Sequence, residues 1–170
     1  MTISMYSASA PVFDRTLGQM LTWFSKAQAH AEARKFDPAN YLGLRLAPDM
    51  LPLARQVQIA SDTAKGCVSR LSGHEVPSWE DKEASLDELA ARVRRTLDHV
   101  AGFGPAQIDG SDAREIVLPT RHGEPLRLSG EVYLRQYALP NFFFHATTTY
   151  ALLRHAGVEL GKTDFLGAMR

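Results

Sequence analysis

The sequence has little cysteine and no excess of charge of either sign. Its single cysteine, Cys67, excludes an intrachain disulfide and is typical of a protein in a reducing cytoplasm. Lysine and arginine together number 19, as do aspartate and glutamate, and this balance argues against a nucleic-acid-binding protein, which normally has a basic face. We therefore expect a cytoplasmic protein without a nucleic-acid partner.

Long apolar runs are also absent. No stretch approaches 18 uncharged apolar residues, so we expect no membrane-spanning helix. The N-terminal segment lacks a basic region and reaches Asp14 and Arg15 too early for a secretory signal, so we expect none. With 170 residues, 45% of them hydrophobic, the chain suits one globular domain with one core, spanning residues 1–170.

What the sequence does have is apolar residues at helical spacing in four segments. The first predicted helix covers about residues 10–33, with Ser9 as its cap. The second covers the residues from a cap at Asp49 to about Ser72, because Gly73 is a good C-terminal signal. The third begins after Ser85, the first residue of an S-L-D-E capping box, and this helix ends near residue 102.

The fourth helix is predicted from a cap at Ser129 to about His155, and Pro140 should kink it near Gln136. Between residues 108 and 129, two short β-prone runs flank a turn at His122-Gly123, which predicts a small hairpin. We expect the tail from residue 158 to be a loop that packs Phe165 and Leu166 onto the rest of the chain. The fold class is therefore all-α, a four-helix bundle with a β-hairpin before the last helix.

Polar side chains fall on the predicted inner face of the fourth helix. At about 100° per residue, the apolar residues Leu134, Ala138, Leu152 and Ala156 lie within about 20° of His145. Asn141 lies one turn before His145 and Thr149 one turn after it. On the second helix, Gln56 falls on the buried side or its edge, whereas Gln58 and Asp62 fall on the flank and back.

Buried amide and imidazole groups cost free energy unless they are hydrogen-bonded, so Gln56, Asn141, His145 and Thr149 should meet one another, a water or a ligand. One interpretation is a structural network without chemistry. The other is a metal or ligand site, because bundle cores commonly build sites from facing helices. Asn and Gln amides are poor ligands for zinc or nickel, and the pattern does not clearly supply better ones.

The remaining candidates have structural interpretations. Cys67 lies on the buried side of the second helix with no base beside it in sequence, which favours a core residue. Asp49 is expected to cap its helix, although it could turn toward the mouth of the bundle, and Asp62 could pair with Lys65. Four histidines fall on predicted outer faces or in loops and should be solvated: His30, His74, His99 and His122.

Several segments are familiar: SMYSASAPVFDRTL, RLAPDMLPLARQVQIASDTAKG, REIVLP and ALPNFFFHATTTYALLRHAGVELGKTDF. Together they resemble a bacterial family of unknown function in the DinB/YfiT-like superfamily of predicted metalloenzymes, over nearly the whole chain. The resemblance implies a DinB-like four-helix bundle, commonly a homodimer. It implies further that many members hold a divalent metal with three histidines. One comes from the second helix, and the other two come from the fourth helix, where they are spaced four residues apart.

The resemblance also implies which residues stand at the metal site. His145 aligns with the second ligand of the fourth helix and Asn141 with the first, and the ligand of the second helix falls near Gln56 or Gln58. Amides thus replace two of the three histidines. Some relatives are thiol-dependent transferases or isomerases.

Three hypotheses follow. The first is a metal-free polar pocket without a cofactor, in which His145 is the acid or base group and a small molecule binds. The second is an enzyme of thiol-dependent transferase or hydrolase type, with zinc or nickel held by His145 and by Asp49 or Asp62. The third is a non-enzymatic dimer in which the polar cluster only fixes the packing.

Overall fold

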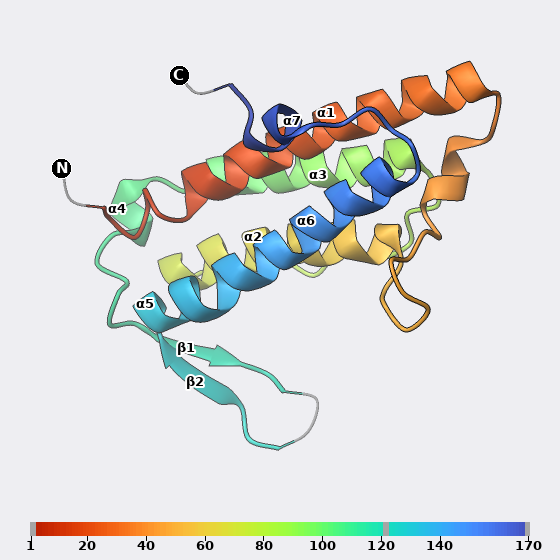
Figure 1. Cartoon of the computed structure of the whole chain (residues 1–170). Coiled ribbons are helices and arrows are strands. Elements are labelled where there is room, and N and C mark those ends of the chain that lie inside the picture. The colour runs from red at the N-terminus through yellow and green to blue at the C-terminus, as the bar shows by residue number, and fades with distance from the viewer. Residues whose placement is uncertain (1–2, 121–122, 169–170) are drawn as a thin grey trace.

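Four long helices dominate the computed structural model, which describes residues 3–120 and 123–168 (Figure 1). They are α1 (Ala10–Arg34), α2 (Leu53–Ser72), α3 (Leu86–Ala101) and α6 (Leu139–His155). Shorter helices join or follow them: η1 (Pro38–Tyr41), α4 (Pro105–Ile108), α5 (Gly130–Val132), η2 (Tyr133–Ala138) and α7 (Lys162–Leu166). None of the described helices is long and apolar enough to cross a membrane.

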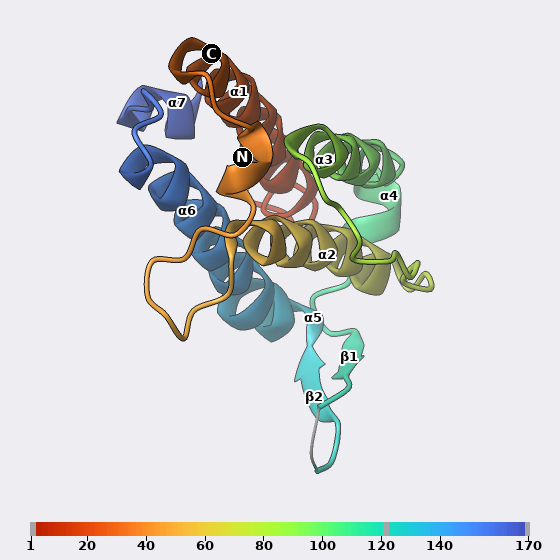
Figure 2. The same ribbon diagram turned by 90° about the vertical axis from the view of Figure 1, so that its right-hand side faces the viewer.

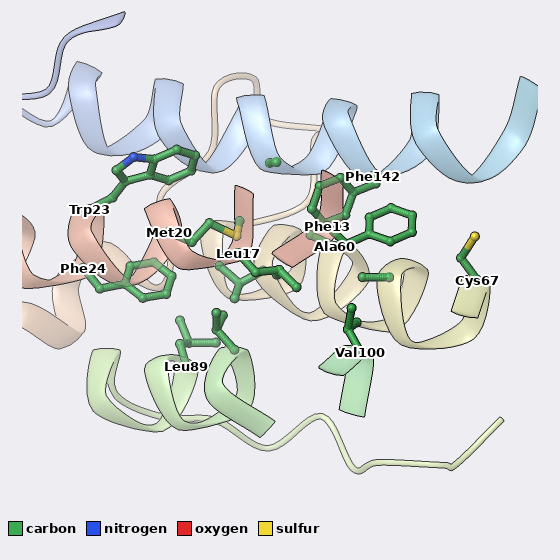
Figure 3. Close-up of a cluster of buried hydrophobic side chains, with 14 of the residues drawn as sticks. Phe13, Leu17, Met20, Trp23, Phe24, Ala60, Cys67, Leu89, Val100 and Phe142 are labelled. Carbon is green, nitrogen blue, oxygen red and sulfur yellow. The ribbon is translucent and has the colours of Figure 1, made fainter. Parts of the chain in front are cut away.

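The long helices form a closed bundle. Around its axis the order is α1, α3, α2 and α6, and each of them packs against the next (Figure 2). The inner faces meet in one apolar core that contains Leu17, Trp23, Leu89 and Phe142 (Figure 3). Each large side chain buried there contributes roughly 1.5–3 kcal/mol by leaving water. The bundle therefore rests on the apolar stripes that the sequence predicts.

Two aspects of that core bear on the predictions from sequence. Phe13 of α1 meets Phe142 of α6 edge to face, with ring centroids 4.9 Å apart. Cys67 is fully buried near the end of α2, as expected (Figure 3). Burial in this apolar environment raises the pKa of the Cys67 thiol, so it is a poor nucleophile.

The start of α2 differs from the prediction. Its N-cap is Pro52 and Asp49 is exposed in the preceding loop, so the expected Asp49 cap is wrong. The physical reason is that the chain satisfies the free donors of this helix by itself. The backbone N–H groups of Leu53 and Ala54 donate to the carbonyls of Leu44 and Leu42, at 2.9 and 3.1 Å.

The other predicted ends are close to the observed ones. Ser85 caps α3 by accepting a hydrogen bond from the Glu88 N–H at 3.1 Å, and α2 ends at Gly73, which takes a left-handed conformation with φ of 76°. Ser9 is the N-cap residue of α1, but its hydroxyl donates back to the Met5 carbonyl at 2.6 Å and does not bind the helix.

The predicted hairpin is confirmed. Strands β1 (Glu115–Leu118) and β2 (Leu126–Ser129) pair antiparallel, with Ile116 opposite Leu128. The hairpin extends from one end of the bundle (Figure 1). Of its predicted turn at His122-Gly123, His122 lies outside the described residues.

The fourth predicted helix, expected as one helix kinked near Gln136, is divided into consecutive helical segments in the structure. Ser129 caps the short α5, η2 is a π-helix, and α6 begins only at Leu139. Pro140 explains this, because it has no N–H to donate to the Gln136 carbonyl of a continuous α-helix. The wider π-turn ends just before Pro140, which then stands in the first turn of α6, where no donor is needed.

The tail was also predicted incompletely. It forms the helix α7, where a loop was expected. Phe165 packs onto the bundle as predicted, stacked on Trp23 with centroids 5.5 Å apart, but Leu166 is exposed, so its predicted packing is wrong. The indole N–H of Trp23 donates to the Asp164 carbonyl at 2.9 Å, which fastens α7 to α1.

Candidate functional site

Helices α2 and α6, with η2 before α6, run antiparallel and are joined by a line of cross-helix hydrogen bonds. Nη1 of Arg70 lies 3.4 Å from the Tyr133 hydroxyl, Nδ2 of Asn141 lies 2.8 Å from Oγ1 of Thr63, and Nδ1 of His145 lies 2.6 Å from Oε1 of Gln56. We call this line the polar seam; it consists of Gln56, Thr63, Arg70, Tyr133, Asn141 and His145.

The Gln56–His145 pair is the most buried part of the seam outside Tyr133. Gln56 is 1% exposed and His145 is 8% exposed. The amide nitrogen of Gln56 donates to the Leu51 carbonyl at 2.9 Å, so its oxygen faces the imidazole and accepts from Nδ1–H. The neutral ring therefore carries its proton on Nδ1, and Nε2 is left as an acceptor without a partner among the described residues.

The electrostatic surroundings favour the neutral imidazole. Burial lowers the pKa of His145 from its ordinary value, and the positive charge of the nearby Arg55 lowers it further. The edge of the ring also meets the aromatic ring of Phe144, with centroids 5.1 Å apart. His145 is thus held in one orientation and one tautomer.

Asn141 and Thr149 behave differently from His145. The Asn141 amide donates to Thr63, whose own hydroxyl donates to the Ile59 carbonyl at 2.7 Å. The Thr149 hydroxyl donates to the His145 carbonyl at 2.9 Å, within its own helix, and so supports the backbone at His145.

Thr63 and Arg70 are members of the seam that the sequence interpretation missed. A signal was present, because Gln56, Thr63 and Arg70 are spaced by seven residues, which is about two helical turns and keeps them on one side of α2.

Three residues predicted for the same pocket lie elsewhere. Gln58 is buried, not on an outer flank, and its amide donates to Glu83 at 2.7 Å, because residues two apart on a helix lie about 200° apart. Asp62 pairs with Lys65 at 2.8 Å and with Arg92 at 3.0 Å. Asp49 is exposed in the loop before α2. None of these three is a hydrogen-bond partner of His145 in the part of the chain that the structure describes.

A charge cluster around the buried Arg92 was not anticipated either. The Arg92 side chain of α3 is 3% exposed and contacts Asp62, Asp81 and Glu83 at 3.0, 2.9 and 2.8 Å. Burial opposes ionisation of Glu83, but hydrogen bonds from Arg92 and Gln58 outweigh it and lower the pKa of this carboxyl.

Two of the histidines expected in solvent are instead half-buried and bonded. Nε2 of His99 lies 2.9 Å from the Ser69 hydroxyl, and Nδ1 of His30 lies 2.6 Å from the Tyr41 hydroxyl. Burial and then the charge of Lys65 lower the pKa of His99. His74 is exposed, as predicted.

The residues at the expected metal position do not fit a zinc or nickel site. Gln56 and Asn141 offer amides beside one imidazole, and the Gln56 oxygen is already engaged by Nδ1 of His145. Within residues 3–120 and 123–168, no three side chains of His, Cys, Asp or Glu are grouped so that they could hold a metal ion.

A cavity of about 270 Å³ opens along the other part of the seam. It lies between α2, η2, the start of α6 and the end of β1, and reaches Asn141, one helical turn before His145. Its lining includes the polar and aromatic side chains of Asp62, Thr63, Arg70, Tyr133, Tyr137 and Asn141.

A four-helix bundle with a small hairpin before its last helix is a DinB-like architecture. A crystal structure of a DinB family member protein from Shewanella denitrificans has the same fold, with a TM-score of 0.87 and 40% sequence identity. The match covers 96% of this chain and 92% of that one.

The family model described as Domain of unknown function (DUF1993) matches residues 5–166, so the chain belongs to the DUF1993 family. A comparison with curated proteins gave no match.

Proposed function

We propose that this DUF1993 protein is a metal-independent, ligand-binding member of the DinB-like bundles, in which a small molecule meets Nε2 of His145. The observation that carries the proposal is the 2.6 Å contact between Nδ1 of His145 and the oxygen of Gln56. It occupies one ring nitrogen and leaves the other as an acceptor for an N–H or O–H group of a ligand.

The chemistry of this nitrogen supports a role as an acid or base. A histidine with a lowered pKa is neutral near pH 7 and can take a proton from a bound molecule. We therefore propose His145 as the catalytic group if the protein is an enzyme, with Gln56 as the residue that positions it. The proposal needs no cofactor, since the amides of the seam do not suit zinc or nickel.

We propose further that the protein is a homodimer in a bacterial cytoplasm. The resemblance to the DinB-like superfamily supports the dimer, and the single buried Cys67 suits a reducing compartment. Sedimentation equilibrium tests the dimer directly: a mass that matches a single 18.8 kDa chain at all concentrations contradicts it.

Thermal-shift screening with a library of small metabolites tests the ligand. We expect compounds that stabilise the wild-type protein to lose their effect in His145→Gln and to keep it in His155→Gln, because His155 is exposed at the end of α6. If the compounds stabilise both variants equally, His145 does not contribute to the binding site.

Elemental analysis of protein purified without a histidine tag separates the proposal from a metalloenzyme. Near-stoichiometric zinc or nickel would overturn it. If no compound binds, and His145→Leu is at least as stable as the wild type, the seam only fixes the packing of the bundle, as in the third hypothesis.

A further inference from the structure

We propose that the cavity beside Arg70 and Tyr133 binds the carboxylate of a small organic acid whose apolar body lies along η2 toward Asn141. This inference rests on the proposed function for the presence of a ligand in the α2–α6 seam. It needs no role of His145, which lies one helical turn beyond the cavity.

The first observation is a cation that is not paired. Lining the cavity, the Arg70 guanidinium makes no ion pair among the described residues, and its side-chain contact is the 3.4 Å one with the Tyr133 hydroxyl. By contrast, Arg55 and Arg92 are both held by carboxylates. A half-buried guanidinium without a carboxylate partner is suited to bind an anion through two parallel N–H groups.

The sequence of α2 makes room for this guanidinium. Gly66 lies one turn before Arg70, and a methyl group at position 66 would collide with Nη1 of Arg70. Glycine within a helix is destabilising relative to alanine, so its presence in the middle of α2 has a cost. Here the glycine leaves space for Nη1 of Arg70 against the helix, and a larger residue would displace the end of the Arg70 side chain.

The second observation is a buried donor beside the cation. Tyr133 is 1% exposed and lines the same cavity. Its oxygen accepts from Arg70, and within the described residues its own hydrogen has no acceptor. A carboxylate placed between them would accept two bonds from the guanidinium and one from the phenol.

Asp62 also borders the cavity and would repel an anion if its charge were free. It is already paired, because Lys65 and Arg92 contact the same oxygen at 2.8 and 3.0 Å. The local positive potential therefore comes from Arg70.

The rest of the lining favours an organic molecule over an inorganic ion. Ile59, Leu118 and the ring of Tyr137, which stacks on Tyr133 at 5.9 Å, provide apolar surface. Farther along, the Asn141 amide donates its N–H to Thr63, which leaves its carbonyl oxygen as an acceptor for a polar group of the ligand. A bare phosphate would use none of these contacts.

Benzoate is a suitable probe, because it combines a carboxylate with a small flat body. Titration of isotopically labelled protein, followed by two-dimensional amide NMR, should give shifts confined to residues around Thr63, Arg70 and Tyr137. Benzamide, the uncharged analogue, and inorganic phosphate, the anion without an apolar body, should bind about tenfold more weakly or not at all.

Variants then test the two donors. Arg70→Gln should weaken benzoate binding about tenfold or more, and Tyr133→Phe about threefold to tenfold. Gly66→Ala, which keeps both donors but displaces the guanidinium, should weaken it as well. Arg154→Gln removes an exposed arginine of α6 and should leave the affinity unchanged.

The inference is overturned if benzoate produces no localised shifts, if benzamide or phosphate binds as tightly, or if Arg70→Gln binds as well as the wild type. The imidazole resonances of His145 are read in the same titration. Benzoate binding that depends on Arg70 but leaves those resonances unchanged supports the carboxylate site and counts against the proposed role of His145. If the His145 resonances move and Arg70→Gln binds benzoate as tightly as the wild type, the result supports the proposed role of His145 and contradicts the carboxylate site at Arg70.

Discussion

The side-chain oxygen of Gln56 lies 2.6 Å from Nδ1 of His145 and joins α2 to α6 in the interior of the bundle. The same amide is fixed from the other side by the Leu51 carbonyl, so that Gln56 links the loop before α2, the helix itself and the imidazole. The resemblance to the DinB/YfiT-like superfamily implies a histidine near this position. Here an amide holds the imidazole directly.

Removing that amide should leave two buried groups without partners. Gln56→Leu deprives Nδ1–H of His145 and the Leu51 carbonyl of their hydrogen bonds, and we expect a loss of about 1–3 kcal/mol in the free energy of unfolding. Urea denaturation measures it. Gln28 is half-exposed, and its side-chain hydrogen bond is the 3.5 Å one to Glu32, so Gln28→Leu should change stability by less than about 0.5 kcal/mol.

The double variant Gln56→Leu/His145→Leu completes the comparison. If the pair is coupled, the double variant should be more stable than the sum of the single changes predicts, by about 1 kcal/mol or more. Strict additivity would mean that the two side chains do not interact in solution.

His145 should make stability depend on pH in a defined window. Its pKa in the folded protein is lowered by burial and by Arg55, whereas in the unfolded chain it should be near the ordinary value of about 6.5. Below that pH the imidazole is protonated more readily in the unfolded chain than in the folded protein. The contribution of His145 to the free energy of unfolding is therefore fully present above about pH 6.5 and decreases as the pH falls below that value. His145→Gln should flatten this part of the curve.

Two controls make the pH prediction specific. Arg55→Gln should raise the pKa of His145, measured from its ring resonances by NMR, because it removes the positive charge. His99, whose pKa is also lowered, contributes in the same direction, so His99→Gln must be measured separately. A pKa of His145 at or above about 6.5 in the wild type would contradict the buried, neutral ring.

The sequence predicts most of the fold because local signals and the core agree. Apolar spacing gives the four long helices, and the capping box at Ser85 and the glycine at position 73 give two of their ends within a residue or two. Asp49 misled the prediction because the donors it would have capped are satisfied by backbone carbonyls of the preceding loop, which no local pattern reveals. The helix α7 was also missed, because it is held by a long-range contact, the hydrogen bond from the Trp23 indole to the Asp164 carbonyl.

The candidate site is only partly readable from sequence. A helical wheel places Gln56 and His145 on inner faces, and the structure brings them together. A helical wheel does not show which residues of two helices face each other, since that depends on the relative axial position of the two helices. Thr63 and Arg70 lie on the same side of α2 as Gln56, but this spacing alone does not pair them with Asn141 and Tyr133.

Pro140 gives a test of the π-helix. In the interior of a continuous α-helix, replacing proline by alanine would stabilise the protein by about 3 kcal/mol. Because Pro140 follows the π-turn and stands in the first turn of α6, Pro140→Ala should change the free energy of unfolding by less than about 1 kcal/mol. Chemical denaturation measures the change, and a gain close to the larger value would mean that the helix is continuous in solution.

Arg92 should be the most sensitive charged residue of the protein. Arg92→Met removes the buried partner of Glu83, while Gln58 still donates to that carboxylate and Arg55 still pairs with Asp81. Because the carboxylates are partly exposed, we expect a loss of about 1–3 kcal/mol at neutral pH. Since Arg92 and Gln58 lower the pKa of Glu83, this carboxylate stabilises the wild type above its unfolded value of about 4.3, and the contribution is lost as the pH falls through the folded value. The stability difference between wild type and Arg92→Met, measured by urea denaturation, should therefore shrink on acidification.

Arg127→Met, which breaks an exposed pair with Glu115, is the control and should lower the free energy of unfolding by less than about 1 kcal/mol. Equal costs for the two variants would show that the Arg92 cluster is solvated and not buried.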